Sequence, residues 1–166
     1  MLKPSAQLLK EVSLLKSLTD SELQQLISFG SSIEYEAHTN VVIEGEMSWG
    51  IYVILEGRVG VYKLNQLTGD HFEVAQIGTG GFFGELSLID ENPRAATVRC
   101  LTNSTLFELK REPFLKLLDQ SPDLKNRVYS NTIRSLIARL RDLDDNYVIS
   151  QYQLWQVALK KEGTQS

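Results

Sequence analysis

The spacing of apolar residues changes along the chain and divides it into three segments. Up to about residue 30, apolar positions follow a helical period, most clearly in the run LTDSELQQLISFG. Thr19 and Glu22 have the spacing of a capping box, and Gly30 is a natural stop for the helix. The pattern predicts an N-terminal helical segment over residues 1–30.

From residue 31 to residue 110 the pattern becomes typical of strands. The run GIYVILEGRVGVYKLN is rich in β-branched and aromatic residues, and HFEVAQIG alternates between two faces. Gly57 and the run LTGDH at 67–71 indicate turns between antiparallel strands, and ATVRC and STLFELK add two further strands. About eight short strands at this spacing predict an antiparallel jelly-roll barrel.

Residues 111–166 return to a helical pattern. Pro122 ends a short helix, and Ser121 can cap the next one, which extends from about residue 122 into the 150s. Together the three segments predict one α+β domain, in which the C-terminal helices are a possible dimerisation element.

The long helix carries a heptad pattern. Its two seam rows are Ile133, Leu140, Tyr147 and Leu154, each followed three residues later by Leu136, Leu143, Ser150 and Val157. All of these except Ser150 are apolar, which is typical of a coiled coil and predicts a homodimer. A single helix packed along its own β domain would need a similar stripe, so this alternative stays open.

Composition narrows the class of protein. The chain has 166 residues, of which 42% are hydrophobic and 23% charged, and its net charge of −4 creates no field that attracts DNA or anionic lipid. No apolar run is long enough to span a membrane, and the N-terminus lacks the apolar core of a signal peptide. The single cysteine, Cys100, fits a reducing cytosol and is interpreted as a buried structural thiol. We expect a cytoplasmic protein.

The stretch FGELSLIDENPRAATV, residues 83–98, carries the candidate chemistry. Arg94 offers a planar fork of donors that suits two phosphate oxygens, and the carboxylate of Glu85 can accept hydrogen bonds from a sugar hydroxyl. Small residues flank both charges: Gly84, Ala95 and Ala96. A salt bridge alone needs no small neighbours, so the stretch predicts a cradle for a sugar phosphate.

Other chemistry finds little support in the sequence. His38 and His71 stand alone in turns and are interpreted as solvated, and no spacing suggests a metal site, a cofactor loop or a nucleophile–base pair. We therefore expect a protein that is not an enzyme and that needs no metal or cofactor.

The pattern F-G-E-L-S-L-(x)4-P-R-A-A-T-V closely resembles the phosphate-binding cassette of cyclic nucleotide-binding domains. This family includes regulatory subunits of cAMP-dependent protein kinase, cyclic nucleotide-gated channels and the bacterial catabolite activator. The resemblance covers about residues 8–145 and includes VVIEGE and GTGGFFGE. The chain departs from the family at EAHTN, where a glycine is usual, and we expect Asn40 to adopt the left-handed conformation instead.

The resemblance implies roles for particular residues. Glu85 would hold the ribose 2′-hydroxyl, and Arg94 would pair with the cyclic phosphate. The short cassette helix and its partner loop would supply the ligand-binding residues Gly84, Glu85, Leu86, Ser87, Arg94, Ala95 and Ala96. A base pocket would contain Val74, Phe83, Leu136, Arg139 and Leu140, with the C-terminal helices as its lid. A threonine directly after the cassette arginine is associated with cGMP in the family, so Ala95 implies cAMP as the ligand in preference to cGMP.

We expect a bacterial cyclic nucleotide receptor module whose C-terminal helix changes on binding and regulates a protein partner or self-association. Because the chain ends at Ser166, it is too short for a helix-turn-helix after the long helix, and we expect no direct DNA binding. Two alternatives stay open. The chain could be an interaction module that keeps the fold, or a detached regulatory subunit of an enzyme or channel on another chain.

Overall fold

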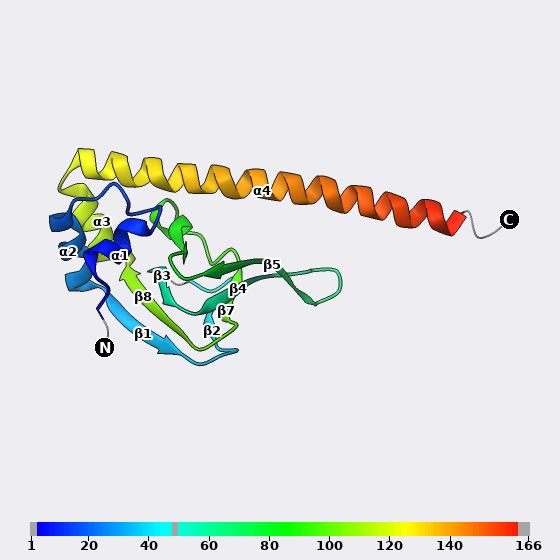
Figure 1. The fold of residues 1–166 in the computed structure, drawn as a ribbon, viewed down its shortest axis with the longest axis horizontal. Coiled ribbons are helices and arrows are strands. Elements are labelled where there is room, and N and C mark those ends of the chain that lie inside the picture. Colours follow the sequence, from blue (N-terminus) through cyan, green and yellow to red (C-terminus); the bar gives the residue numbers. More distant parts are fainter. Residues whose placement is uncertain (1–2, 48–49, 163–166) are drawn as a thin grey trace. The chain divides into compact units, whose positions relative to one another are not determined.

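A computed structural model describes residues 3–47 and 50–162 of the chain, and side chains up to residue 156. The chain divides into two compact units, Met1–Asn131 and Thr132–Ser166. The first unit contains every strand that is described, together with the shorter helices (Figure 1). The second consists of the greater part of the long helix α4 (Pro122–Glu162).

Eight antiparallel strands form two four-stranded sheets in the first unit (Figure 1). The strands are β1 (Ser31–Tyr35), β2 (Asn40–Val42), β3 (Gly50–Glu56), β4 (Arg58–Leu64), β5 (His71–Gly78), β6 (Phe82–Phe83), β7 (Thr97–Cys100) and β8 (Ser104–Lys110). One sheet has the order β1-β8-β3-β6 and the other the order β2-β7-β4-β5. Eight strands divided in this way form a jelly roll, which confirms the predicted fold class.

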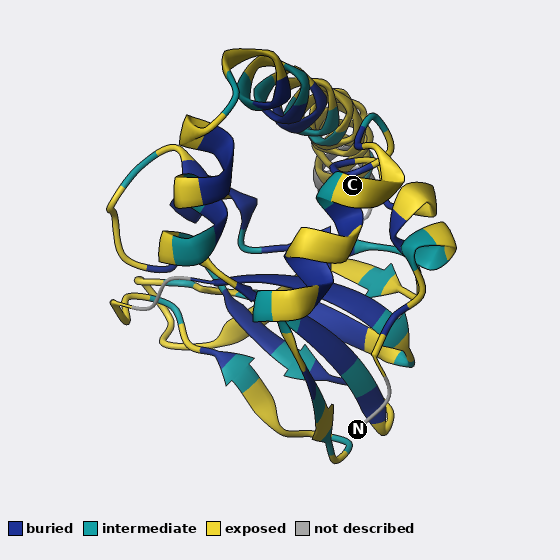
Figure 2. Ribbon diagram, turned by 90° about the vertical axis from the view of Figure 1, so that its left-hand side faces the viewer, coloured by how far each residue is buried: buried dark blue, intermediate teal, exposed yellow. Residues whose placement is uncertain are grey.

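Strands β3 and β8 contribute to two hydrophobic cores because their side chains alternate between the two faces of the sheet. Ile51 and Val53 pack among the buried residues of the helices. The neighbouring Ile54 and Leu106 belong to the core between the two sheets, which also contains Cys100. The burial pattern follows this arrangement, with dark blue segments in both layers (Figure 2). Cys100 is therefore a buried structural thiol, as predicted, and burial raises its pKa.

The N-terminal helices α1 (Ala6–Glu11) and α2 (Asp20–Phe29) cover the first core. The predicted capping box is confirmed, since the Thr19 and Glu22 side chains each accept a hydrogen bond from the other's backbone N–H. Gly30 ends α2 with an extended backbone and not a left-handed one. A β-carbon at Gly30 would lie 2.2 Å from the Phe107 ring, so close packing on the sheet requires glycine there.

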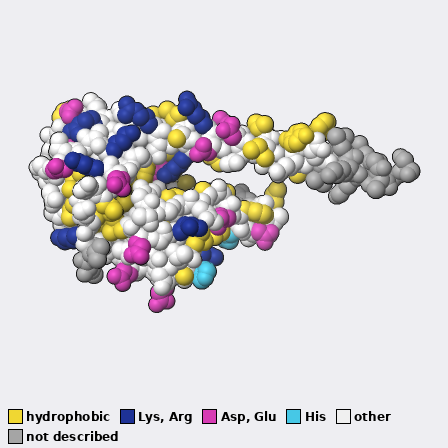
Figure 3. All heavy atoms as spheres, in the orientation of Figure 1, with side chains coloured by type: hydrophobic (Ala, Val, Ile, Leu, Met, Phe, Trp, Pro, Cys, Tyr) yellow, Lys and Arg dark blue, Asp and Glu magenta, His cyan; other side chains and the backbone are white. Residues whose placement is uncertain are grey.

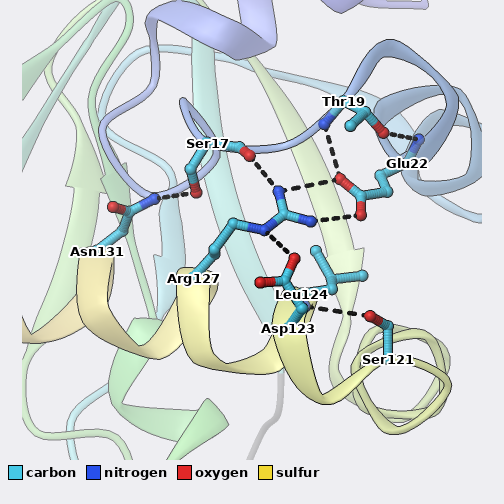
Figure 4. A network of polar contacts seen from close by, with 8 residues as sticks. All are labelled: Ser17, Thr19, Glu22, Ser121, Asp123, Leu124, Arg127 and Asn131. Carbon is cyan, nitrogen blue, oxygen red and sulfur yellow. Dashed lines mark hydrogen bonds and ion pairs between the residues drawn. The ribbon is translucent and has the colours of Figure 1, made fainter.

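The C-terminal part of the first unit is fastened to the N-terminal helices by a polar network (Figure 4). Helix α3 (Arg111–Asp119) precedes α4. The predicted cap of α4 is present, since Ser121 Oγ accepts a hydrogen bond from Leu124 N. Arg127 forms an ion pair with Glu22, with Nη2 and Oε1 2.7 Å apart, and also donates to the carbonyl of Ser17. These contacts fix the first turns of α4 against α2.

The predicted left-handed conformation of Asn40 is wrong. His38 adopts it instead, with φ 69°, and its N–H donates to the carbonyl of Cys100 at 2.7 Å. Asn40 is the first residue of β2, and strand pairing requires an extended backbone there. The chain therefore reverses two residues earlier, in the turn that precedes the strand.

Beyond residue 131, helix α4 exposes apolar side chains along its length (Figure 3). The exposed seam residues are Ile133, Leu140, Leu143, Tyr147 and Leu154. The side chain of Val157 lies outside the described residues. Among the described helices, not one has both the length and the apolar composition needed to cross a membrane.

Candidate functional site

The cassette begins where β6 ends. Gly84 has φ 86°, and a β-carbon there would lie 2.4 Å from the carbonyl oxygen of Gly50 and 2.7 Å from Nη1 of Arg94. Any side chain at this position would push Arg94 away from the start of β3. Glycine is therefore required for two reasons, the left-handed backbone and the close approach of the guanidinium.

The guanidinium of Arg94 is held by contacts with β3. Its Nη2 atom donates to the carbonyl oxygen of Gly50 at 3.0 Å, and its Cζ atom lies 5.9 Å from the centre of the Tyr52 ring. The residue is only 8% exposed. Its backbone is also fixed, because Arg94 N donates to the carbonyl of Glu46 and its own carbonyl accepts from Gly45 N, both at 2.9 Å. The guanidinium is thus placed by contacts from residues far away in the sequence.

Burial gives this arginine an unusual electrostatic environment. Loss of water lowers the pKa of Arg94 from its ordinary value, while Tyr52, Glu108 and Glu85 act in the opposite direction. Burial also raises the pKa of Tyr52, whose hydroxyl donates to Glu108 Oε1 at 3.0 Å. Because an arginine pKa lies far above neutrality, the guanidinium remains a buried cation at physiological pH. A buried cation of this kind favours an anionic ligand.

Glu85 begins the short 3-10 helix η1 (Glu85–Leu88), directly after Gly84. The residue is only 2% exposed, in contrast with Leu86, which is 41% exposed. Ser87 is also buried, and its hydroxyl donates to the carbonyl of Gly84 at 2.7 Å, which closes the turn. The structure thus brings the predicted acidic and basic residues of the cassette together in one buried region.

The other limb of the cassette, after Arg94, is fixed to the second sheet. The carbonyl of Ala95 accepts a hydrogen bond from Lys63 Nζ at 2.6 Å, and the same ammonium forms an ion pair with Glu44. Ala95 is exposed and Ala96 half-buried. The next residue, Thr97, is buried and begins β7.

The residues of the expected base pocket occupy different places. Val74 lies exposed on the edge strand β5. Phe83 is buried and stacks on Tyr52, with ring centres 5.0 Å apart. Leu136, Arg139 and Leu140 belong to α4 beyond residue 131, in the second unit. The role of these five residues in base recognition stays a prediction.

A hollow of about 390 Å³, away from the cassette, is unsuited to a phosphate. It lies at the turn between β8 and its neighbours and is lined by the carboxylates Glu34, Glu36 and Glu56. These acidic side chains would repel an anion. No group of three or more potential metal ligands occurs among the residues that the structure describes, and the two histidines, His38 and His71, are both exposed.

Several residues that shape the site were not predicted from the sequence. Gly50, Tyr52 and Lys63 support Arg94 and Ala95, yet each belongs to a strand with no distinctive motif. Arg111 contacts η1 from the start of α3. A cation in the first turn of a helix faces an unfavourable dipole, and this could have marked Arg111 as a residue with another role.

Comparison with known proteins identifies the family. The profile described as "Cyclic nucleotide-binding domain" matches residues 32–121, which is more than half of the chain. The chain therefore belongs to the cyclic nucleotide-binding domain family, as its cassette suggests. This is a family of regulatory and sensor domains.

Two relatives with named functions show where such domains occur. The regulatory subunit of cAMP-dependent protein kinase from Candida albicans is 36% identical over 110 residues, covering 66% of this chain and 23% of that protein. The cyclic AMP receptor protein of Thermus thermophilus is 28% identical over 136 residues, covering 82% of this chain and 61% of that protein. The chain thus spans about a quarter of the kinase regulatory subunit.

Solved structures agree with the fold. The regulatory domain of Toxoplasma gondii PKA, crystallised with cAMP, is 31% identical with a TM-score of 0.64, covering 68% of this chain and 42% of that chain. A cyclic nucleotide-binding domain from Methylobacillus flagellatus is 26% identical with a TM-score of 0.74, covering 85% and 83% of the two chains.

Proposed function

We propose that this chain is a cAMP receptor module in which Arg94 binds the cyclic phosphate and Glu85 binds the ribose. The observation that carries the proposal is the buried guanidinium of Arg94, which bonds the Gly50 carbonyl and lies so close to Gly84 that no side chain fits there. A phosphate diester has two oxygens that a guanidinium can bind with paired hydrogen bonds. The buried setting strengthens that interaction because little water competes for it.

Two features support the assignment of the sugar to Glu85. Its carboxylate is acceptor-only when ionised, which suits a hydroxyl donor. It is also buried within the same turn as Gly84 and Ser87, so a nucleotide phosphate at Arg94 would bring its ribose close by. We further propose cAMP over cGMP, since Ala95 has no hydroxyl for a guanine amino group.

The module acts through binding alone in this proposal. Its output is a change in the C-terminal helix that alters a protein partner or self-association, without catalysis. Ligand binding can drive such a change only if the two states of the helix differ in affinity for the ligand. The expected contact is Arg139 stacking on adenine. If that contact exists, calorimetry should show weaker cAMP binding by Arg139→Ala.

We also propose that α4 pairs with α4 of a second copy. Among its exposed apolar residues, Ile133, Leu140, Tyr147 and Leu154 recur with the seven-residue period of a coiled-coil seam. The charges favour one orientation. With Ile133 at position a, Arg139 falls at g and Asp144 at the following e, the two positions that meet between parallel helices in register.

An antiparallel pair would lack this match. There, position g faces g and position e faces e, so Arg139 would not meet Asp144 of the second copy. Parallel pairing also places Asn146 opposite Gln151, which can form amide hydrogen bonds. Sedimentation equilibrium would test the pairing, and a monomer at every concentration would refute it.

Mass spectrometry of the nucleotide that remains bound after purification would test the receptor proposal directly. Pull-down with and without that nucleotide would then identify a partner whose binding depends on it. Retention of cAMP, or heat on titration with it, would support the proposal. Absence of binding to both cAMP and cGMP at millimolar concentration would refute it and favour an interaction module that only keeps the fold.

A further inference from the structure

Arg111, the first residue of α3, connects that helix with the cassette. Its Nε atom donates to the carbonyl oxygen of Ser87, and its Nη1 atom lies 3.3 Å from Oε1 of Glu91. The side chain is 22% exposed, whereas that of Glu91 is 75% exposed. One guanidinium therefore bridges the end of η1 and the loop that leads towards Arg94.

The position of Arg111 is unfavourable for a cation unless these contacts offset it. The first turn of a helix carries a partial positive charge, which destabilises a cation there. The N-cap residue, Lys110, makes no side-chain capping hydrogen bond. The charge of Arg111 is therefore unfavourable next to the helix dipole, and the contacts of this side chain lie in the cassette.

Ser87 is held on both sides by hydrogen bonds, and one of them comes from Arg111. The hydroxyl and the N–H of Ser87 both bond the carbonyl of Gly84, at 2.7 Å and 3.2 Å. Arg111 holds the carbonyl on the opposite side of the same residue. The backbone between Gly84 and Ser87 includes Glu85, so a shift of this turn would move the carboxylate that we assign to the ribose.

We infer that Arg111 is a positioning residue, which holds η1 in its ligand-binding geometry and couples the cassette to α3. The inference rests on the proposed function for the identity of the ligand. A planar fork is needed because the two acceptors, a carbonyl and a carboxylate, lie on different segments. A lysine would keep the charge and could not hold both with the same geometry.

Calorimetry with cAMP tests the inference in four variants. We expect Arg111→Ala to weaken binding about tenfold or more, since a buried carbonyl loses a charged donor. Arg111→Lys should fall between this variant and the wild type, and Glu91→Gln should have the smallest effect because it leaves the bond to Ser87 intact. Lys116→Ala is the matched control, as its ammonium pairs with the exposed Glu112 on α3 and, among the residues described, not with the cassette. It should bind like the wild type.

Hydrogen exchange without ligand separates positioning from general destabilisation. In Arg111→Ala, exchange should accelerate in residues 84–91 and stay unchanged in β3 and β8. The protection that cAMP causes in α3 should also diminish. Wild-type affinity together with wild-type exchange in residues 84–91 would overturn the inference, as would acceleration spread evenly over the sheets.

The two proposals can fail separately. If the wild type binds no cyclic nucleotide, the proposed function fails, and the exchange comparison without ligand still decides whether Arg111 fixes η1. If the wild type binds cAMP, and both Arg111 variants bind it equally well and exchange like the wild type in residues 84–91, the function stands and the role of Arg111 is wrong.

Discussion

Arg94 lies over the ring of Tyr52, with its Cζ atom 5.9 Å from the ring centre, and both residues are buried. Tyr52 comes from β3 and reaches Glu108 on β8 with its hydroxyl, at 3.0 Å. The platform under the guanidinium is thus part of the sheet that also forms the core. Since these contacts already fix the arginine, a ligand can be bound without the cost of ordering it at that moment.

The close approach at Gly84 predicts a large effect of a small substitution. Gly84→Ala adds a methyl group 2.4 Å from the Gly50 carbonyl and 2.7 Å from Arg94 Nη1. Gly69→Ala is the matched control, because its φ is also positive, at 78°, and nothing lies within 4 Å of the added carbon. We expect both to lose the roughly 1–2 kcal/mol of a left-handed alanine, and Gly84→Ala to lose about 1–3 kcal/mol more through overpacking.

Urea denaturation measures these losses, and titration with cAMP should show weakened binding only for Gly84→Ala. Equal stability of the two variants would mean that the approach of Gly84 to Arg94 is not tight.

The residue after Arg94 should influence the choice of base. Ala95 is exposed and only its carbonyl is engaged, by Lys63. Ala95→Thr adds a hydroxyl and should reduce the preference for cAMP over cGMP in a direct competition assay. Ala95→Val has nearly the same shape without the hydroxyl and should leave the ratio unchanged. A wild type that binds cGMP more tightly would reverse the proposed preference.

Charge exchange tests the orientation of the α4 pair. Arg139→Glu places two acidic residues opposite each other, and Asp144→Arg places two basic ones, so each variant alone should dimerise more weakly, by about 1–2 kcal/mol for the two symmetric pairs. An equimolar mixture of the two variants should dimerise about as strongly as the wild type, because the heterodimer restores both attractions. Sedimentation equilibrium compares the three samples. A mixture that dimerises no more strongly than either variant alone would contradict parallel, in-register pairing.

The network at the base of α4 predicts a pH dependence of stability. Burial raises the pKa of Glu22, but hydrogen bonds from Arg127 and from the backbone and side chain of Thr19 outweigh it, so the pKa lies below 4.5. A lowered folded-state pKa stabilises the fold above pH 4.5, and this contribution disappears as the pH falls through the folded-state pKa. Glu22→Gln keeps the capping box and removes the charge.

We expect this variant to lose about 1–2 kcal/mol at pH 7, as for a hydrogen bond to a charged group, and less at pH 3.5. Denaturation at the two pH values measures the difference. Glu112→Gln removes an exposed carboxylate of α3 and serves as the control, with little change at either pH. A loss for Glu22→Gln that does not depend on pH would show that Arg127 is not its electrostatic partner.

Local sequence features predicted much of this structure. The Thr19 capping box, the Ser121 cap and the eight strands follow from spacing within a few residues, and each was confirmed. Glu85 and Arg94 could be proposed as partners of one ligand because their chemistry is distinctive and both lie in one short stretch.

Long-range contacts could not be predicted in the same way. Gly50 and Tyr52 are more than 40 residues from Arg94, and only the pairing of the strands brings them beneath it. The turn before β2 shows a similar limit. Asparagine is the better left-handed residue locally, but the pairing of Asn40 with β7 requires it to be extended, and His38 turns instead.

Titration of cAMP into the wild type and into Arg94→Lys tests the central claim most directly. Lysine keeps the positive charge and lacks the fork that binds two phosphate oxygens, so we expect affinity to fall at least about tenfold. Arg99→Lys is the matched control, because Arg99 stacks on Tyr62 and bonds Asn40, outside the cassette, and it should bind cAMP like the wild type. Equal affinity of Arg94→Lys and wild type, or no heat from the wild type with millimolar cAMP or cGMP, would contradict the account.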